Sequence, residues 1–396
     1  MLHNSNKEII LKEEQEESIL AIYLENEQIN YIPEKDSGYT LDLAKSGCNN
    51  GVTISFDYNT WSVKTNYSNY TNTDNTRVKC SLYFKKRTFA ESLVDCGALS
   101  KDAETCIKEN YHLTEEVVDD KTVDHNLRFI GADPDNYVWF NNELWRIIGV
   151  MNNIDDGTGK KETRLKIIRN EAIGEYSWDC TAEGKYGNNW TNSTLMALLN
   201  TGAYYNRTTG VYYTNDGNNI VTNTIDFSNL GLEDKAKSMI NNAVWGISGT
   251  NTFNDILVSK FYEIEHLNTM SWIGKIGIIH PSDYGYATSG KDNSNREACL
   301  SVPLYYWNDE NYILSDCYLN NWLYNENFQW TLTPSLDSNF GVFCVGSDGN
   351  ITSCSHPDYG ASISPTVYLI SSIKITSGAG SKENPYKLSG IPDNIR

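Results

Sequence analysis

The fold of the larger part of this chain is decided by one stretch near its middle, Tyr137-Val138-Trp139-Phe140-Asn141-Asn142-Glu143-Leu144-Trp145-Arg146-Ile147-Ile148-Gly149-Val150. Two runs of strand-forming residues flank the pair Asn141-Asn142, and asparagine tolerates the positive φ that a two-residue hairpin turn requires. We therefore predict an antiparallel hairpin that turns at these two residues. Segments 330–334 and 364–369, near the end of the chain, are predicted as strands that close the same domain around its core.

The neighbouring segments extend this domain in both directions. Residues 127–131 and 163–169 are apolar runs typical of strands. Residues 191–200 begin with polar side chains and continue as an apolar run, which predicts a helix, and apolar residues at helical spacing predict a second helix over 232–245. Because the remainder is loops rich in Gly, Ser, Asn and Tyr, we predict an α+β domain with few helices and long loops over residues 122–396.

The first third of the chain has a different pattern. Residues 18–87 contain short alternating strands separated by Asn- and Gly-rich turns, which is typical of a small β-sandwich. Residues 88–121 place apolar residues at helical spacing, followed by acidic ones, and predict a short helical connector. Residues 1–17 are interpreted as a stalk or linker that followed a removed anchor, with an ordinary cytosolic N-terminus as the alternative.

Composition excludes two classes of partner. The 396 residues leave room for two or three domains, and the formal net charge of −19 repels nucleic acids and anionic membranes. No apolar run approaches the ~20 residues that span a bilayer, so we do not expect an integral membrane chain. The 26 Tyr and nine Cys point outside the cell, because so many cysteines are typical of exported proteins in which most are paired.

Four disulfides are predicted from the spacing of the cysteines. Cys344 and Cys354 flank a Gly-Ser-Asp-Gly-Asn turn and are expected to face each other in a hairpin, and Cys299 and Cys317 are symmetric about Asn308. The other expected pairs are Cys48 with Cys80 in the small domain and Cys96 with Cys106 in the connector, which leaves Cys180 over. Free thiols and other pairings remain alternatives, because eight cysteines allow about 105 connectivities.

The sequence lacks the common motifs of catalysis and of transition-metal binding. None of the six histidines has a partner at ligand spacing, and no HExxH, CxxC or GxSxG pattern occurs. The segment His280-Pro281-Ser282-Asp283 gathers His, Ser and Asp, but catalytic groups usually meet in space rather than in sequence. We interpret that segment as a solvated loop, and we predict no catalytic residue, no enzyme activity and no organic cofactor.

Calcium is the one ion that the sequence leaves open. Two loops cluster oxygen ligands of the kind that calcium binds, and the candidates are Asp155, Asp156, Asp348 and Asn350. Neither loop has the complete EF-hand pattern, and the ordinary turn chemistry of Asp, Asn and Gly accounts for both.

Ligand binding is predicted from aromatic residues that stand in loop-like contexts. Tyrosine offers a large contact area at low entropy cost, and Asn and Ser add adaptable hydrogen bonds. The candidates are Tyr204, Tyr205, Tyr212, Tyr213, Tyr284, Tyr286, Tyr305, Tyr306, Trp307, Asn308 and Asp309. For each ring the alternative is a place in the core. The triplet Trp307-Asn308-Asp309, expected at a hairpin tip, resembles the calcium and sugar site of C-type lectins.

From Leu127 to Leu388 the chain resembles an uncharacterised domain of proteins exported by Gram-positive bacteria of the gut. The resemblance rests on residues 128–137, 145–150, 166–169, Trp190, 193–195, 276–279, 321–323 and 384–386. It implies a C-type-lectin-like fold related to the formylglycine-generating enzyme, and residues 38–42 and 48–51 resemble the small β modules that often precede it.

Two departures from the family bear on activity. Ser364 stands where the family commonly has an arginine before the proline at 365. The closely spaced cysteine pair that binds copper in formylglycine-generating enzymes has no match in this chain. The resemblance therefore does not imply oxidase activity.

The function class that these features favour is an extracellular, surface-exposed binding protein of the adhesin type, held at the cell surface through an anchor outside this chain. The expected partner is a glycan or a protein on a host or neighbouring bacterial cell. Two alternatives stay open: a structural subunit of a pilus-like or surface-layer assembly that associates with copies of itself, and an enzyme on the formylglycine-generating scaffold.

Overall fold

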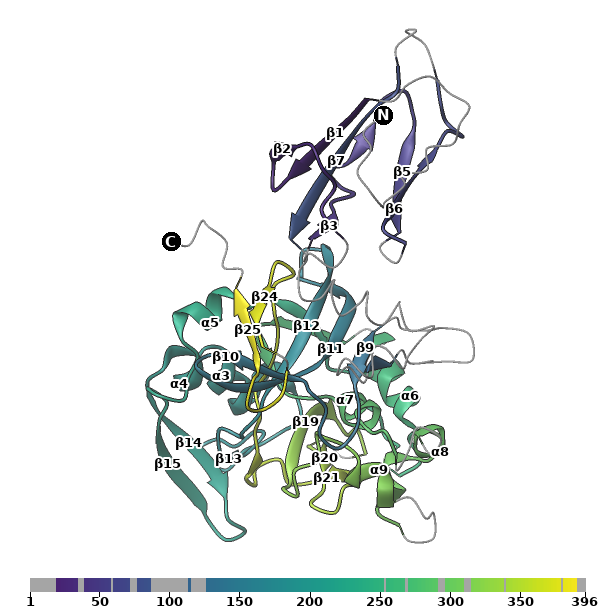
Figure 1. Cartoon of the computed structure of the whole chain (residues 1–396). Coiled ribbons are helices and arrows are strands. Elements are labelled where there is room, and N and C mark those ends of the chain that lie inside the picture. Colours follow the sequence, from purple (N-terminus) through teal and green to yellow (C-terminus); the bar gives the residue numbers. More distant parts are fainter. Residues whose placement is uncertain are drawn as a thin grey trace. The chain divides into compact units, whose positions relative to one another are not determined.

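The computed structural model describes residues 19–34, 39–57, 60–71, 77–86, 113–114, 126–252, 254–267, 270–290, 296–309, 315–337, 340–378 and 380–389. The stalk at 1–17, most of the expected connector at 88–121 and the Cys96–Cys106 bridge lie outside the described residues. The described chain is mixed and rich in sheet, and its helices are few and short (Figure 1). It divides into two compact units, Met1–Asp95 and Cys96–Arg396.

The smaller unit consists of strands in two layers. Its main sheet has the order β2-β1-β7-β3, with β4 also paired to β7, and β1 runs parallel to β7. The bounds are β1 Ile19–Leu24, β2 Glu27–Ile29, β3 Tyr39–Leu41, β4 Gly47–Cys48 and β7 Lys79–Lys86. The second layer is the hairpin of β5 (Thr53–Asp57) and β6 (Ser62–Asn66), which packs Phe56 and Val63 against the buried Leu82 and Phe84.

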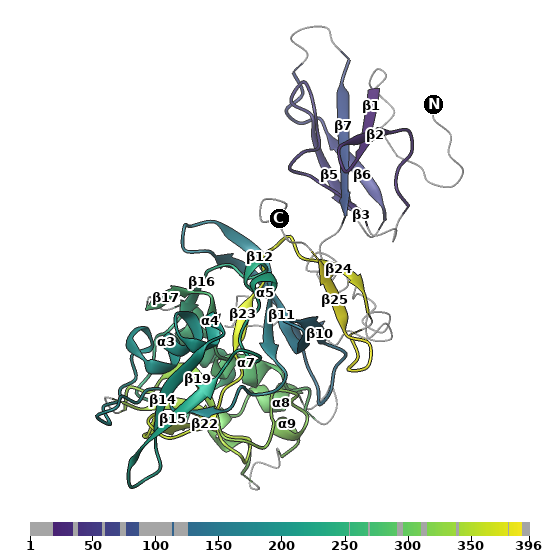
Figure 2. The same ribbon diagram turned by 90° about the vertical axis from the view of Figure 1, so that its left-hand side faces the viewer.

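The larger unit is organised around a nine-stranded sheet of order β18-β23-β12-β11-β10-β25-β24, with β9 beside β11 and β8 beside β9. Figure 2 shows β24 and β25 at its edge, in yellow. The bounds are β8 Leu113–Thr114, β9 Leu127–Phe129, β10 Tyr137–Phe140, β11 Glu143–Asp155, β12 Lys161–Arg169, β18 Ile276–Gly277, β23 Thr366–Tyr368, β24 Lys374–Ser377 and β25 Tyr386–Ser389.

The hairpin at the centre of this sheet is the one that the sequence predicts. Phe140 pairs with Glu143, and the two turn residues Asn141 and Asn142 have φ of 56° and 60°. Ile147 and Ile167 pair across β11 and β12, and neither side chain is exposed. The central strands are therefore buried, which explains their nearly continuous apolar sequence.

A second sheet of five strands has the order β13-β22-β19-β20-β21. Its bounds are β13 Glu175–Tyr176, β19 Gln329–Pro334, β20 Val342–Val345, β21 Ile351–Cys354 and β22 Ala361–Ser362. The strands expected at 330–334 and 364–369 are both present. They lie in different sheets, because β19 belongs to this second sheet and β23 to the nine-stranded one.

Three predicted disulfides form, between Cys48 and Cys80, between Cys299 and Cys317, and between Cys344 and Cys354. The expected geometry is wrong for two of them. Cys344 pairs with Thr352 and Cys354 with Val342, so these cysteines are offset by two residues, because Gly346 bonds to Asn350 and the turn lies one residue earlier than expected. The Cys299–Cys317 bond joins two helices, α8 (Arg296–Leu300) and α9 (Ser315–Leu319), rather than two strands of a hairpin.

The remaining elements are two small hairpins and short helices. The hairpins are β14 (Thr209–Asn215) with β15 (Ile220–Asp226), and β16 (Ala243–Gly246) with β17 (Ser271–Gly274). The helices are η2 Trp190–Asn192, α3 Thr194–Asn200, α4 Ala203–Asn206, α5 Asp234–Ser238, α6 Val258–Tyr262, η3 Glu263–Leu267, α7 Pro281–Tyr286, α8 Arg296–Leu300, η4 Leu304–Tyr306 and α9 Ser315–Leu319. The element η3 is a π-helix.

The helix predicted over 232–245 is wrong in extent. Only Asp234–Ser238 is helical, and residues Ala243–Gly246 form a strand that pairs with β17. Trp245 pairs with Trp272 across these strands and is buried. The apolar residues that were predicted to form one face of a single helix belong instead to a short helix and to the buried strand that follows it.

Candidate functional site

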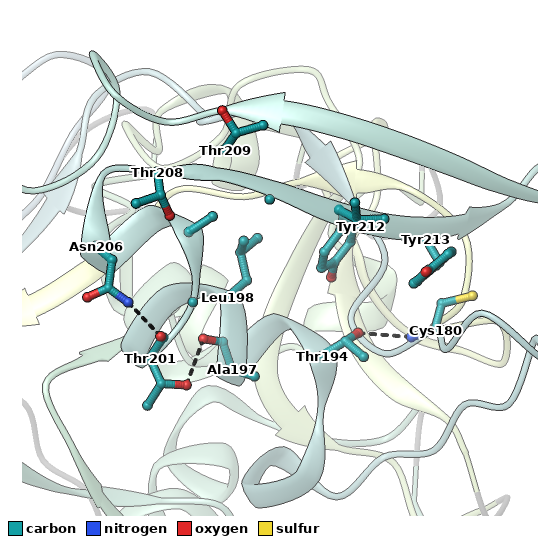
Figure 3. Close-up of a pocket in the computed structure, with 14 residues that line it drawn as sticks. Cys180, Thr194, Ala197, Leu198, Thr201, Asn206, Thr208, Thr209, Tyr212 and Tyr213 are labelled. Atoms are coloured by element: carbon teal, nitrogen blue, oxygen red, sulfur yellow. Dashed lines mark hydrogen bonds between the residues drawn. The ribbon is translucent and has the colours of Figure 1, made fainter.

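A pocket of about 490 Å³ lies between helices α3 and α4 on one side and strand β14 on the other (Figure 3). Helix α3 is fixed by its N-cap, Ser193, whose hydroxyl accepts a hydrogen bond from the Met196 N–H at 3.1 Å. At the helix end, the Asn200 carboxamide donates to the Ile276 carbonyl at 2.8 Å and ties the helix to β18. A tight turn at Gly202 then leads into α4, where a Cβ would stand 2.9 Å from the Ala197 carbonyl oxygen.

None of the fourteen described residues that line this pocket carries a charged side chain, although the chain has a net charge of −19. Four of them are threonines, at 194, 201, 208 and 209, and we refer to the cavity as the threonine pocket. Figure 3 shows Thr208 and Thr209 across the cavity from Thr201. The pocket therefore offers hydroxyl groups and apolar surface, but no counter-charge for an ionic ligand.

The hydroxyls differ in how they are engaged. The Thr194 hydroxyl accepts from the Cys180 N–H at 3.0 Å, and the Thr201 hydroxyl donates to the Ala197 carbonyl at 3.2 Å. The hydroxyls of Thr208 and Thr209, both exposed, hydrogen-bond no described protein group. These two groups are available to a ligand as donors and acceptors.

Cys180 lines one end of the threonine pocket and is the free cysteine among the described residues. Burial raises the pKa of its thiol to about 11, and the carboxylates of Asp358 and Asp179 add to this effect. The thiol bonds weakly to the Thr181 carbonyl, with 3.6 Å between sulfur and oxygen. Because a thiol acts as a nucleophile only when it is deprotonated, the raised pKa leaves little of the Cys180 thiol in its reactive form at neutral pH.

Tyr212 and Tyr213, two of the predicted ligand-binding residues, line this pocket. Tyr212 is buried, its ring packs on Tyr176 with 5.1 Å between centroids, and its hydroxyl donates to the Ser177 carbonyl. Burial raises the pKa of the Tyr212 hydroxyl well above its usual value. Tyr213 is half-buried. Tyr212 therefore supports the pocket wall, and Tyr213 is the more accessible of the two rings.

Four other aromatic candidates are core residues, and the prediction that they lie exposed on loops is wrong. Tyr204, Tyr284, Tyr286 and Trp307 are each at most 1% exposed. Every residue of α7, which carries Tyr284 and Tyr286, is buried, and the Trp307 indole donates to the Cys299 carbonyl at 3.2 Å. These rings fill the interior of a unit that has few long elements to pack.

The remaining aromatic candidates are half-buried. Tyr205 accepts a hydrogen bond from Lys275 at 2.9 Å, and Lys237 lies 5.1 Å from its ring centroid. Tyr305 and Tyr306 pack against each other edge to face, with centroids 5.1 Å apart. None of these three rings lines the threonine pocket.

The triplet Trp307-Asn308-Asp309 follows the short helix η4, not a hairpin tip as expected. The structure brings it next to one of the calcium candidates, because the Asn308 amide donates to the Asp348 carboxylate.

In the other candidate calcium loop, backbone N–H groups of the loop itself bond to a candidate ligand. Asp155 accepts from the Gly157 and Gly159 N–H groups at 2.8 and 3.0 Å. Calcium binding stays a prediction at both places.

A cluster of buried polar groups, which the sequence pattern did not reveal, lies beneath the π-helix η3. The Lys166 ammonium on β12 contacts the Asp283 carboxylate at 2.6 Å, and both side chains are at most 5% exposed. His280 and Asp283 form a capping box at the start of α7, so the segment interpreted as a solvated loop is part of the core. The available signal was Lys166 itself, a cation within the apolar run 165–168.

The charges of this cluster are set by burial and by pairing. Burial alone would raise the pKa of Asp283, but the Lys166 ammonium and hydrogen bonds outweigh it and hold that pKa well below its usual range. Burial raises the pKa of Glu265 to about 7, against the opposing effect of His280. The Glu265 carboxylate accepts from the Thr333 hydroxyl at 3.1 Å and from the Ser282 N–H at 3.3 Å.

The donor atoms of Glu265, His266 and His280 lie within 4.8 Å of one another, but the arrangement does not favour a metal ion. The Nε2 of His280 is 2.9 Å from the Gly246 carbonyl, which can only accept, so this nitrogen carries the proton. Its Nδ1 faces the Lys166 ammonium at 3.5 Å. A cation at Nδ1 would meet that positive charge, and we interpret the cluster as structural.

No protein family, no curated protein and no solved structure matches this chain. The resemblance to the lectin-like domain of exported proteins therefore stays a prediction. Among the described residues, no helix has the length and apolar character needed to cross a membrane.

Proposed function

We propose that this chain is an extracellular, surface-exposed binding protein of the adhesin type, and that the threonine pocket takes a neutral polar ligand, the end of a glycan on a host or neighbouring cell. The observation that carries the proposal is the uncharged lining of this pocket in a chain of net charge −19. A charged ligand would need a counter-charge that the lining lacks.

A neutral sugar fits the chemistry of the pocket wall. Sugars present hydroxyls that both donate and accept hydrogen bonds, together with apolar C–H faces. The wall offers the free hydroxyls of Thr208 and Thr209, and the apolar side chains of Leu198 and Val211. Its volume lies within the range of about 300–1,000 Å³ usual for small-ligand sites.

Three disulfides support the extracellular part of the proposal, because such bonds persist in oxidising compartments. We further propose that the larger unit is a C-type-lectin-like domain related to the formylglycine-generating enzyme, and that the protein is held at the cell surface. The mixed, sheet-rich architecture with short helices is compatible with that relationship.

Glycan-array binding of two matched variants tests the role of the pocket. Ala197 is exposed on α3 and lines the cavity, so Ala197→Phe should fill it with little effect on folding. Asn192→Phe places the same ring on a nearby exposed position outside the lining. Array signals lost in Ala197→Phe and kept in Asn192→Phe would support the proposal. No glycan bound by the wild type, or equal binding by both variants, would count against it.

The structure supports the two alternative functions to different degrees. An enzyme on the formylglycine-generating scaffold gains no support from the threonine pocket, because burial raises the pKa of Cys180, the one cysteine among the described residues that line it. A self-associating structural subunit is favoured by a specific observation, the open strand edge of β15.

A further inference from the structure

Strand β15 has one edge without a partner strand. The hairpin β14–β15 forms a sheet of its own, and β15 pairs only with β14 among the described strands. In Figures 1 and 2 the hairpin lies at the margin of the larger unit, and its tip extends free of the neighbouring ribbons. An unpaired strand edge presents backbone donors and acceptors on which another strand can pair.

The hydrogen-bond pattern shows which residues face this edge. Two bonds bracket the ladder, from the Asp216 N–H to the Asn219 carbonyl and from the Phe227 N–H to the Thr208 carbonyl. Since bonding alternates along an antiparallel pair, residues 221, 223 and 225 bond to β14, and residues 220, 222, 224 and 226 direct their backbone groups outward. On β14, the outward Asn215 N–H bonds to the Asp358 carbonyl, which fixes the same alternation.

The sequence of β15 is nearly palindromic. It reads Ile220-Val221-Thr222-Asn223-Thr224-Ile225-Asp226, and its inner residues 221–225 are symmetric in residue type about Asn223. An antiparallel copy centred there would pair Thr222 with Thr224 and Val221 with Ile225, and both kinds of cross-strand pair are favourable. The outward residues on each side would then all find partners.

The strand also lacks the features that protect open edges. Between Ile220 and Ile225 it has no proline, no glycine and no charged residue, and the register shows no bulge. Its one charged residue, Asp226, would lie opposite Ile220 of the second copy, so no like charges meet in the ladder. Thr222 and Thr224 are exposed.

We propose that β15 pairs with β15 of a second copy of this chain about a two-fold axis at Asn223, and so forms a four-stranded antiparallel sheet. The pairing is independent of what the threonine pocket binds. Because each copy has a net charge of −19, the dimer should strengthen as added salt screens the repulsion between them.

Sedimentation velocity of the full chain over a concentration series tests the association. The wild type should show a monomer–dimer equilibrium that shifts with concentration. Thr222→Pro removes an outward N–H that no bond within the hairpin uses, so the fold should persist while dimerisation weakens about tenfold or more. Circular dichroism checks the fold of the variant. A wild type that stays monomeric, or a folded Thr222→Pro protein that dimerises as well as the wild type, would overturn the proposal.

Oxidative cross-linking tests the register. Asn223 would face its own copy in a non-hydrogen-bonded pair with about 4.5 Å between Cα atoms, so Asn223→Cys should form a covalent dimer. In Thr222→Cys the two sulfurs would come from diagonal positions about 7–8 Å apart, at or beyond the limit for a disulfide. Preferential cross-linking of Asn223→Cys on a non-reducing gel is expected. Equal cross-linking of both variants would exclude the register centred on Asn223.

Discussion

Lys166 is the residue on which the buried polar cluster of the larger unit depends. It stands on a buried strand, and Asp283 neutralises it from the start of α7. The rings of Trp245 and Tyr368 lie 5.5 and 5.4 Å from its ammonium and provide further favourable contact. Desolvation offsets much of the attraction between the two charges, so the pair adds little net stability, whereas loss of one partner would leave an uncompensated buried charge. The pair fixes the position of α7 relative to β12.

Glu265, in the same cluster, makes the stability of the protein depend on pH. Burial raises its pKa in the folded state to about 7, above the ordinary value of 4.5. Between these values the folded state binds more protons than the unfolded state, so the free energy of unfolding falls as pH rises through this window. The neutral variant Glu265→Gln should match the wild type near pH 5 and exceed it by roughly 3 kcal/mol at pH 8.

Urea unfolding at several pH values measures this difference. Glu263→Gln, at the surface of the same π-helix, is the matched control, and its difference from the wild type should not change with pH in this way. Parallel pH profiles for Glu265→Gln and the wild type would mean that Glu265 titrates near its ordinary value.

The Asn141-Asn142 turn joins the central sheet to α5. The Asn141 carboxamide oxygen accepts the Glu233 N–H at 2.7 Å, and the Asn142 amide donates to the Glu233 carboxylate at 2.7 Å. Glu233 is the N-cap position of α5 and makes no capping bond with its own side chain. The hairpin turn therefore satisfies the N–H of the N-cap residue, one of the donors at a helix start that have no partner within the helix.

The sequence predicted elements where local chemistry decides them. The hairpin at Asn141, a helix within 191–200 and the three described disulfides followed from turn residues, a polar start before an apolar run, and cysteine spacing. Prediction from the sequence failed where contacts with residues distant along the chain determine the secondary structure or the burial of a side chain. Trp245 joins a strand because β17 pairs with it, and Tyr284 is buried because neighbouring elements cover α7.

The candidate site was predicted only in part for the same reason. Tyr212 and Tyr213 were named from their local context and do line the threonine pocket. The threonines on α3 and around β14 were not predicted, because Thr201 and Thr209 line one cavity only once α4 has folded between α3 and β14. No pattern in a single sequence indicates that these residues line the same cavity.

Substitution of Asn141 should separate the two roles of the turn. Its φ of 56° lies in the left-handed region, which alanine adopts only with strain, and its side chain bonds to Glu233. Asn141→Ala should cost about 1–3 kcal/mol of unfolding free energy, and Asn141→Gly, which tolerates this φ, should cost less. Denaturant unfolding of both variants is the measurement. An equal loss in both would show that only the hydrogen bond matters.

Pairing through β15 would make binding by the threonine pocket bivalent, a consequence that rests on the proposed function. The pocket flanks β14, and β14 would lie three strand spacings, about 14 Å, from its copy in the shared sheet. Two weak sites held at a fixed separation bind a repetitive surface far more tightly than one. Such avidity suits a protein that attaches to a glycan-covered cell.

The two units should differ most in how they depend on their disulfides. The smaller unit has two small clusters of buried side chains, and its Cys48–Cys80 bond closes a separation of 32 residues. Loop entropy assigns about 4 kcal/mol to this bond, against about 3 kcal/mol for the 10-residue separation of Cys344–Cys354 in the larger unit. In scanning calorimetry, Cys48→Ser/Cys80→Ser should therefore lose the transition of the smaller unit and keep that of the larger one.

The matched variant Cys344→Ser/Cys354→Ser should keep both transitions and lower only that of the larger unit, because a more extensive core remains around its β20–β21 hairpin. Limited proteolysis assigns the transitions, since cleavage of the first double variant should fall within 19–86 and spare 126–389. If removal of the Cys48–Cys80 bond abolished both transitions together, the smaller unit would have to contribute to the folding of the larger one.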